Sequence, residues 1–476
     1  MATITSLGVG SGLNLNTIVE QLTALERRPL TQMRSDANRL QTQVSSFGQI
    51  KSLFGSLQDA SNTLNRNTLW SSTVASSADD KTVGATGNNG AAAGRYAVQV
   101  EQLARSQTLA TATAYSSASA KVGSGTLELG LGAWSAQTGE FTPKLDSTAT
   151  QIAVTDDDTV QTLRDKINSA GVGVTASLVT DSTGVRLSLR ATATGVDNGF
   201  RLSATGASGG LEGLAYDPPN GASNLNLVQA AADAKASVNG IAVVSASNDL
   251  TGVIDGLTLR LRQPSTTPVE VTVSSDTEAV TKAIKTFADA YNALATYIND
   301  QTKYDAASRR GGPLQGDTSA NSLMSQLRGV LNTPSAASTA FSRLSDVGLR
   351  AQRDGTLQVD SAKLSSAVGR LDELKKAFTN SDPATPSQNG FSRRYAALAS
   401  GVLAVDGNLA IRTEGLRKLI TRNESDQARV SDRAERFQAR LVEQYTALDA
   451  NVARLNSLNS YVTQQMTALN RSSSSR

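Results

Sequence analysis

The chain has 476 residues, with 45 basic and 42 acidic side chains and neither cysteine nor histidine. This length allows more than one domain, and a nearly balanced charge without a basic tract gives nucleic-acid binding no electrostatic basis. The absence of Cys and His from the sequence excludes disulfides, His/Cys zinc sites, cysteine nucleophiles and a Ser-His-Asp triad. Only 4% of the residues are aromatic, which favours thin helices and small β domains over an enzyme core. We therefore expect no enzyme activity and no cofactor or metal.

Residues 1–14 are expected to form a polar, Gly-rich arm. Their Gly-Val-Gly-Ser-Gly string lacks the preceding strand and following βαβ unit that a phosphate-binding loop needs. They also lack the basic and apolar regions of a Sec signal peptide. The longest apolar runs of the chain are too short to span a membrane. We expect no membrane insertion, and export by a route that needs no cleaved signal peptide.

Two helices are expected before residue 70. Asn16 is the expected N-cap of a short one, and Pro29 should end or kink it because the residue before a proline is pushed out of helical space. The second helix, residues 30–69, carries apolar side chains every seven residues, as a helix that packs against another helix does. This N-terminal row consists of Met33, Leu40, Phe47 and Phe54.

The middle of the chain is expected to be β structure. Residues 152–190 predict a β-α-β-β unit in which Asp158 caps the helix. Asp156, Asp157 and Asp158 could together hold Ca²⁺, but helix capping and the helix dipole explain them without an ion. Further strands are expected between residues 236 and 273.

A helix is expected to follow Ser275, which forms a capping box with Glu278. Its apolar residues recur at alternating spacings of four and three, and they are Val280, Ile284, Phe287, Tyr291, Leu294 and Ile298. We interpret Phe287, Tyr291 and Ile298 as the core of a helical layer rather than as an interface between molecules.

Residues 408–476 predict a long amphipathic helix. Two rows of mostly apolar residues recur every seven positions, as in a coiled coil. The first row is Leu441, Leu448, Leu455, Val462 and Leu469, and the second is Tyr445, Val452, Asn459 and Met466. Asn459 either fixes register and strand number or is an exposed residue near a frayed end. We expect this helix to engage the N-terminal heptad helix and other molecules, so that the two ends form an assembly surface.

These elements predict an α+β multidomain fold, in which terminal heptad helices form a coiled coil and a helical bundle and two β-rich domains are nested as insertions. The predicted domains are terminal coiled-coil arms at 1–40 and 430–476, a helical bundle at 41–70 and 275–429, a first inserted β-rich domain at 71–115 and 232–274, and a second, outer β-rich domain at 116–231.

Short strings spread along the chain carry a family resemblance. They are LGVGSGL at 7–13, GRYAVQV at 94–100, VNGI at 238–241, ADAYN at 288–292, DVGL at 346–349, DGTL at 354–357 and YTALD at 445–449. In this order and spacing the chain resembles the FliD family of flagellar hook-associated, filament cap proteins. Residues 167–178 resemble the hook/flagellin insertion motif of flagellar axial proteins. Residues 115–230 match the family only in pattern.

The resemblance implies a structural protein that caps the distal end of the bacterial flagellar filament, retains exported flagellin and promotes its folding and polymerisation. It implies a ring-shaped, pentamer-like homo-oligomer with flagellin as its partner at the filament tip. It also implies an export chaperone and export by the flagellar type III apparatus to an extracellular position.

Two alternatives stay open. One is an extracellular adhesin that binds host mucin or glycan through the outer β domain, where Trp134 is the only tryptophan. The other is a junction or flagellin-like protein that forms continuous filaments instead of a closed ring.

Overall fold

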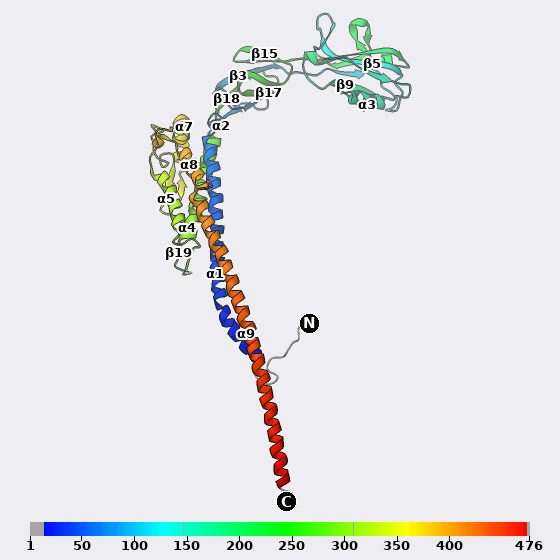
Figure 1. Ribbon diagram of the computed structural model, residues 1–476. Coiled ribbons are helices and arrows are strands. Elements are labelled where there is room, and N and C mark those ends of the chain that lie inside the picture. Colours follow the sequence, from blue (N-terminus) through cyan, green and yellow to red (C-terminus); the bar gives the residue numbers. More distant parts are fainter. Residues whose placement is uncertain (1–13, 146, 308, 474–476) are drawn as a thin grey trace. The chain divides into compact units, whose positions relative to one another are not determined.

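The computed structural model describes residues 14–145, 147–307 and 309–473. The predicted arm up to residue 13, with its Gly-rich string, lies outside this range. The chain divides into a helical unit, residues 1–66 and 280–476, and a β unit, residues 67–279 (Figure 1). The predicted α+β multidomain class is confirmed.

The helical unit is built from both ends of the chain. Its helices are α1 (Leu15–Asn65), α4 (Thr277–Thr302), α5 (Thr318–Asn332), α6 (Ser361–Val368), α7 (Leu371–Thr379), α8 (Phe391–Leu403) and α9 (Asn408–Ser473), with the 3₁₀ turn η4 (Pro386–Gln388). Two short antiparallel hairpins join them, β19 (Tyr304–Asp305) with β20 (Arg310–Gly311), and β21 (Leu349–Ala351) with β22 (Leu357–Val359). The long terminal helix expected from residue 408 is confirmed.

Helix α1 is continuous through Pro29, so the predicted break between two helices is wrong. A proline inside a helix removes one backbone donor and crowds the preceding turn, and here the adjacent Leu30 is buried, which favours the helix through this point. The predicted N-cap is also wrong, because Asn14 rather than Asn16 caps α1. The Asn14 side chain accepts a hydrogen bond of 3.2 Å from the backbone N–H of Thr17.

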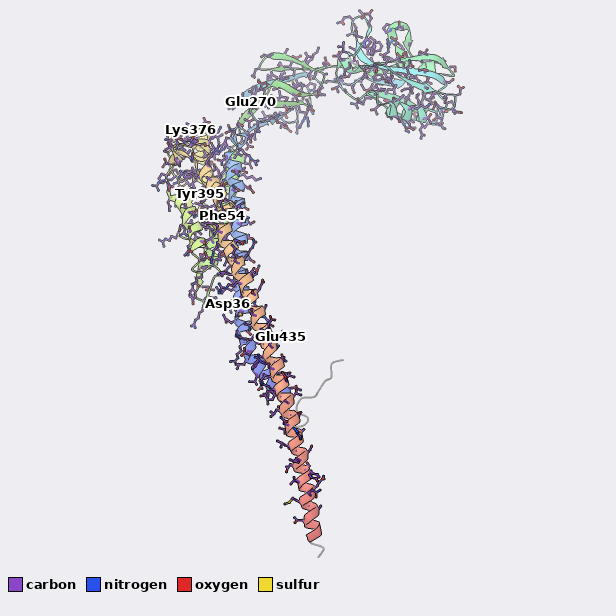
Figure 2. The ribbon with its side chains drawn as sticks, viewed as in Figure 1. Asp36, Phe54, Glu270, Lys376, Tyr395 and Glu435 are labelled. Carbon is purple, nitrogen blue, oxygen red and sulfur yellow. The ribbon has the colours of Figure 1, made fainter. Side chains whose placement is uncertain are left out.

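Phe287, Tyr291 and Ile298 of α4 are fully buried, so their prediction as core is confirmed. Tyr395 of α8 packs edge-on against Phe287 and Tyr291, with ring centroids 5.3 and 5.8 Å apart. Phe54 of α1 is also fully buried; Figure 2 labels it and Tyr395. This aromatic core holds together segments from both ends of the chain.

The predicted cap at Ser275 is wrong by one residue. Helix α4 begins at Thr277, and the carboxylate of Asp276 accepts a 2.8 Å hydrogen bond from the backbone N–H of Ala279. An aspartate and a serine are equally suitable N-caps, so sequence preference could not choose between these neighbours.

The β unit begins with α2 (Asn67–Trp70) and a pair of antiparallel sheets. One sheet has the strand order β1 (Thr73–Ser77), β18 (Val269–Ser275), β3 (Gly94–Gln102), β14 (Ala234–Val238) and β15 (Ile241–Ser245). The other has the order β16 (Asp249–Ile254), β17 (Leu257–Leu261) and β2 (Val83–Gly87). Their apolar faces share one core, which contains Val98, Val100 and Leu259.

Residues between β3 and β14 form two further antiparallel sheets around a second core. One has the order β12 (Ala222–Ser223), β11 (Tyr216–Asp217), β10 (Gly199–Ser208), β5 (Ser124–Trp134) and β6 (Phe141–Pro143), with β7 (Thr150–Val154) also paired to β5. The other has the order β13 (Leu225–Gln229), β4 (Thr108–Thr111), β9 (Gly184–Ala191) and β8 (Val174–Asp181). Single turns of 3₁₀ helix are η1 (Val196–Asn198), η2 (Leu211–Leu214) and η3 (Pro218–Asn220).

The predicted β-α-β-β order is present as β7, α3 (Val160–Ala170), β8 and β9, but the strands lie in different sheets. Strand β7 pairs with β5, whereas β8 pairs with β9. The side chains of α3 that face inward, Leu163 and Ile167, are buried in the core that both sheets share. The helix therefore links the two layers instead of covering one sheet.

Asp158 does not cap α3, because Thr159 is the N-cap and forms a reciprocal capping box with Thr162. The Asp158 carboxylate instead accepts hydrogen bonds from Lys166 at 2.6 Å and from the backbone N–H of Thr155 at 2.8 Å. Burial of Asp158 raises its pKa, but these bonds outweigh burial and hold the pKa well below its usual value. The residue is therefore already satisfied by protein donors.

The finer domain boundaries remain a prediction. Strand β4 falls before the predicted boundary at residue 115, yet it pairs with β9 and β13, and Leu109 lies in the second core. The chain thus enters the outer part of the β unit soon after β3.

Candidate assembly surface on the terminal helices

Helices α1 and α9 lie side by side along the helical unit (Figure 1). Phe47 of α1 and Leu409 of α9 line the same groove, whereas Glu26, much nearer the start of α1, pairs with Arg433 at 3.2 Å. Positions earlier in α1 therefore meet positions later in α9, so the two helices run antiparallel.

A buried apolar seam joins the pair. Its buried members are Leu15, Val19 and Leu30 on α1 and Leu409, Leu416, Ala434 and Leu441 on α9. Except for Leu441, these residues were absent from the predicted assembly rows. For Ala434 the sequence does contain a signal, since Ile420, Gln427, Ala434 and Leu441 are spaced by seven, but a glutamine and an alanine make this row inconspicuous.

A polar pair interrupts the seam in the first half of α9. The side chain of Gln427 donates a 2.6 Å hydrogen bond to the side-chain oxygen of Asn423, one turn earlier, and both residues are half-buried. Because the two polar groups satisfy each other, the seam can tolerate them. In the heptad rows of the sequence, only Asn459 was predicted as a polar interruption.

One ion pair anchors the start of α9 to α5. The guanidinium of Arg412 donates through Nε and Nη2 to the same Asp317 oxygen, at 3.0 and 2.7 Å. The other Asp317 oxygen caps α5 by accepting from the backbone N–H groups of Ser319 and Ala320 at 2.9 and 3.2 Å. Asp317 is buried, so its charge is compensated from two sides.

The predicted N-terminal row divides between two environments. Phe47 and Phe54 are fully buried in the helical unit. Met33 and Leu40, nearer the start of α1, are half-buried. Within this chain, the later half of the row therefore contributes to a core, and the earlier half retains exposed surface.

The predicted C-terminal rows change from buried to exposed along α9. Leu441 is buried and Tyr445 is half-buried. Beyond them lies a set that we call the α9 stripe, consisting of Leu448, Val452, Leu455, Val462 and Met466. Val452 is half-buried, while Leu455 and Met466 are 63% and 62% exposed. Asn459 is exposed on the same side, and the side chain of Leu469 lies outside the described residues.

The stripe becomes exposed where α9 extends beyond the first described turn of α1 (Figure 1). Its surroundings are nearly uncharged, because residues 448–466 contain only Asp449 and Arg454 as charged side chains. Two further apolar side chains flank it, Leu458 and Tyr461, which are also exposed. A contiguous exposed apolar surface of this kind is typical of an interaction site.

Trp134 is part of the packing of the β unit. Its indole N–H donates a 3.0 Å hydrogen bond to the backbone oxygen of Phe200. Its ring lies 4.8 Å from the ring of Phe141 and 5.5 Å from that of Tyr216, between centroids. These contacts give Trp134 a structural role in joining β5, β6, β10 and β11.

No helix within the described part of the chain combines the length and the apolar composition that crossing a membrane requires. Among the same residues, no group of three or more carboxylates is arranged to hold a metal ion.

Comparison with known proteins shows which family this arrangement belongs to. Family models described as the flagellar hook-associated protein 2 N-terminus and C-terminus match residues 11–107 and 231–457. The chain is 30% identical over 475 residues to flagellar hook-associated protein 2 of Escherichia coli strain K12, covering 98% of both chains. The chain belongs to the flagellar hook-associated protein 2 family, the FliD family of flagellar cap proteins.

Other comparisons agree with membership of the flagellar hook-associated protein 2 family. The Salmonella typhimurium member is 31% identical over 489 residues, covering 99% of this chain and 100% of that one. A crystal structure of the D1-D2-D3 domains of the Escherichia coli flagellar cap protein FliD matches 78% of this chain with a TM-score of 0.61 and 26% identity. A flagellin hook IN motif matches residues 136–193, which confirms the predicted likeness of residues 167–178.

Proposed function

We propose that this protein caps the distal end of the bacterial flagellar filament, retains exported flagellin there and promotes its folding and polymerisation. The observation that carries the proposal is the exposed α9 stripe at the end of a helix pair, in a chain of the flagellar cap family. In this role the protein works as a structural part and not as an enzyme.

The stripe suits a contact that forms and breaks repeatedly. Burying one leucine contributes about 2 kcal/mol, so the five side chains of the stripe can supply a useful but limited binding energy. The near absence of charge around Leu455 also means that an apolar partner meets little desolvation cost there. We infer that the stripe, with the exposed parts of Met33 and Leu40, engages the filament end or neighbouring cap molecules.

The remaining parts follow from the same proposal. The β unit supplies subunit contacts in a ring-shaped, pentamer-like homo-oligomer, and flagellin is the partner at the filament tip. An export chaperone and the flagellar type III apparatus deliver the chain without a cleaved signal peptide. The four predicted domains, with terminal arms at 1–40 and 430–476, are the modules of this assembly.

A full-length variant tests the stripe directly. Leu455→Glu with Val462→Glu places two charges on it, whereas Ser457→Glu with Gln464→Glu places two on the opposite face of the same helix. We expect cells with the stripe variant to release flagellin into the medium and to carry few or short filaments. The control should retain flagellin, and both variants should have the circular dichroism and melting temperature of the wild type, because all four positions are exposed. Normal filaments with the stripe variant would contradict the proposal.

The adhesin alternative has no specific observation in its favour here, because Trp134 is engaged in packing. Mucin binding by the full-length protein that is lost on substitution of exposed residues of the β unit would revive it.

A further inference from the structure

We propose that the free edge of strand β15 binds an extended, uncharged segment of flagellin that has been exported but has not yet folded, by adding it to the sheet as a further strand. This deepens the capping function and rests on it, because the proposed function supplies the identity of the partner. Three features of the molecule support it: the unpaired backbone of β15, the protection of other sheet edges and the apolar side chains of β15.

Strand β15 has an unpaired edge. In the part of the chain that the structure describes, it is the last strand of its sheet and pairs with β14 alone (Figure 1). Val238 and Ile241 flank the two-residue turn between these strands, so they form a hydrogen-bonded pair, and such pairs alternate along antiparallel strands. Ala242 and Val244 therefore direct their backbone N–H and C=O groups away from β14.

This edge is anchored and has definite ends. At one end, the tight turn begins at Asn239, which has a φ angle of 51°. The Asn239 backbone N–H donates to the oxygen of Ala97 in β3, and the Asn239 side-chain oxygen accepts from the Ala97 N–H, both at 2.8 Å. At the other end, the backbone oxygen of Ala246 accepts a 2.6 Å hydrogen bond from the Thr194 hydroxyl. The strand between them gives a free edge about 17 Å long.

Other sheet edges of this protein are closed by side chains. Strand β8 is also the last strand of its sheet, but Asn168 of α3 bonds both backbone groups of Ala176 there, donating to its oxygen at 2.9 Å and accepting from its N–H at 2.7 Å. Asn292 of α4 does the same for Leu357 in β22, at 2.8 and 2.5 Å. A carboxamide bonded in this way occupies the place of a further strand.

Further edges are protected by the backbone. Strands β13 and β16 each contain an irregularity in register, and such bulges prevent regular pairing with another chain. Strand β1, at the opposite end of the sheet from β15, is covered by β2, whose Gly87 is so close that a side chain there would meet the backbone oxygen of Thr73 at 3.0 Å. By contrast, β15 keeps a regular register along its whole length and is open to a regular partner strand.

Strand β15 presents apolar, uncharged side chains to such a partner. Its sequence, IAVVS, contains neither a charged residue nor a proline, which are residues that commonly protect an edge. Ile241 and Val244 are 71% and 63% exposed and lie on opposite faces of the sheet. An added strand can therefore pack on both faces while its backbone bonds to Ala242 and Val244.

An unfolded chain fits this edge better than a second folded copy does. Two copies paired through β15 would contribute five residues each, whereas a stable interface takes about 20 residues a side. An exported chain that is retained at the filament tip is instead present at a high effective concentration, so a weak site is enough. When that chain folds, its own strands pair with the backbone groups of the bound segment, and the edge of β15 releases it.

Proline substitution tests the edge in the full-length protein. Val244→Pro removes an outward N–H but no bond to β14, and proline is tolerated on the solvent side of an edge strand. Thr180→Pro is the matched control, since Thr180 occupies an equivalent outward position in β8, on the edge that Asn168 closes. The probe is a fluorescein-labelled, end-blocked peptide of alternating valine and threonine, and its binding is followed by fluorescence anisotropy. Circular dichroism and thermal melting compare the fold of both variants with that of the wild type.

We expect the wild type and Thr180→Pro to bind the peptide equally and Val244→Pro to bind it about tenfold more weakly, because the variant loses a hydrogen bond and its ring obstructs the edge. Val244→Lys keeps every backbone group, should also weaken binding, and serves as the test if the proline variant melts early. No binding by the wild type, or equal binding by the wild type and both Val244 variants, would overturn the proposal. Self-association that Val244→Pro abolishes, without peptide binding, would overturn it as well and would assign the edge to a second copy.

Competition identifies the partner. Flagellin freshly diluted from denaturant should displace the labelled peptide from the wild type, and folded flagellin should not. Displacement by neither would overturn the assignment to unfolded flagellin. Flagellin retention by cells with the α9 stripe variant is measured separately, so a negative result at β15 leaves the capping function intact.

Discussion

Asp317 connects two elements that are far apart in the sequence. One of its oxygens caps α5, and the other binds Arg412 of α9. No local sequence pattern predicts the ion pair between Asp317 and Arg412, because these two residues are 95 positions apart. The capping role of Asp317 can be predicted from the sequence, since an aspartate directly before a helix is a favoured N-cap.

Two substitutions separate these roles. Asp317→Asn keeps a capping side chain and loses the charge that faces Arg412, so we expect the free energy of unfolding to fall by about 1 kcal/mol. Asp317→Ala loses both functions, and we expect a loss of about 3 kcal/mol. Denaturant unfolding followed by circular dichroism measures the difference. Equal losses for the two variants would mean that the ion pair, and not the cap, carries the whole effect.

Glu373 at the start of α7 gives the helical unit a dependence on pH. Its carboxylate accepts hydrogen bonds from Lys376 at 2.7 Å and Ser338 at 2.6 Å. The bond from Lys376, then that from Ser338, lowers the pKa of Glu373 from 4.5 to about 2. Since the folded pKa is the lower one, the stabilisation is complete above the unfolded pKa and is lost as pH falls towards about 2.

We therefore expect Glu373→Gln to melt below the wild type at neutral pH, with the gap closing between pH 4.5 and about 2. Thermal melting across this range provides the measurement. Glu435→Gln, at an exposed position of α9 (Figure 2), removes one negative charge elsewhere and is the control for the change in net charge. A gap for Glu373→Gln that stays constant with pH would rule out the linkage.

At the scale of elements, α1 contains a proline, a residue that normally breaks or kinks a helix. Pro29 is exposed inside a helix of 51 residues and lacks the backbone N–H that the helical pattern requires. Packing along α9 on the other face maintains the helix through this point. The sequence predicted a break in the helix because local preference considers only the steric effect of the proline on its neighbours and not the packing on α9.

Pro29→Ala should stabilise α1 by about 2 kcal/mol, because it restores one hydrogen bond and relieves the crowding of the preceding turn. The melting temperature of the helical unit and slower amide exchange around residue 29 are the measurements. Pro386→Ala is the matched control, since Pro386 occupies the first turn of η4, where proline is well tolerated, and its effect should be small. A destabilised Pro29→Ala protein would show that the proline conformation is itself needed for packing on α9.

At the scale of the whole molecule, the two cores of the β unit contain only residues of that unit. Phe54 is fully buried in the helical unit, and Phe200 is fully buried in the second core of the β unit. Because no β-unit core includes a residue of the helical unit, we expect the helical unit to unfold separately from the β unit.

Alanine at each position tests this independence. Phe54→Ala should remove about 4 kcal/mol from the helical unit, and Phe200→Ala a similar amount from the β unit. In calorimetry each variant should lower one transition and leave the other in place. A common shift of both transitions in either variant would show that the two units unfold together.

The sequence was most informative where its pattern is long and regular. The seven-residue repeats predicted helices at both ends of the chain, and the spacing of Phe287, Tyr291 and Ile298 predicted a buried face. Both predictions were possible because a helix buried on one face has apolar residues at regular intervals in its sequence. Ordered strings along the chain were enough to indicate the family. The exact caps were missed at Ser275 and Asp158, since adjacent polar residues have similar capping preferences.

Only the tertiary structure decided which members of a repeat are buried and which are exposed. Leu441 and Leu455 occupy equivalent positions in one heptad row, but Leu441 lies beside α1 and Leu455 lies beyond it. Likewise, the β-α-β-β order was readable, whereas the separation of β7 from β8 and β9 into different sheets was not. Hydrophobic periodicity predicts that a face of a helix or strand is buried against something. Which element packs against that face depends on contacts between residues hundreds of positions apart, and no local pattern encodes such long-range contacts.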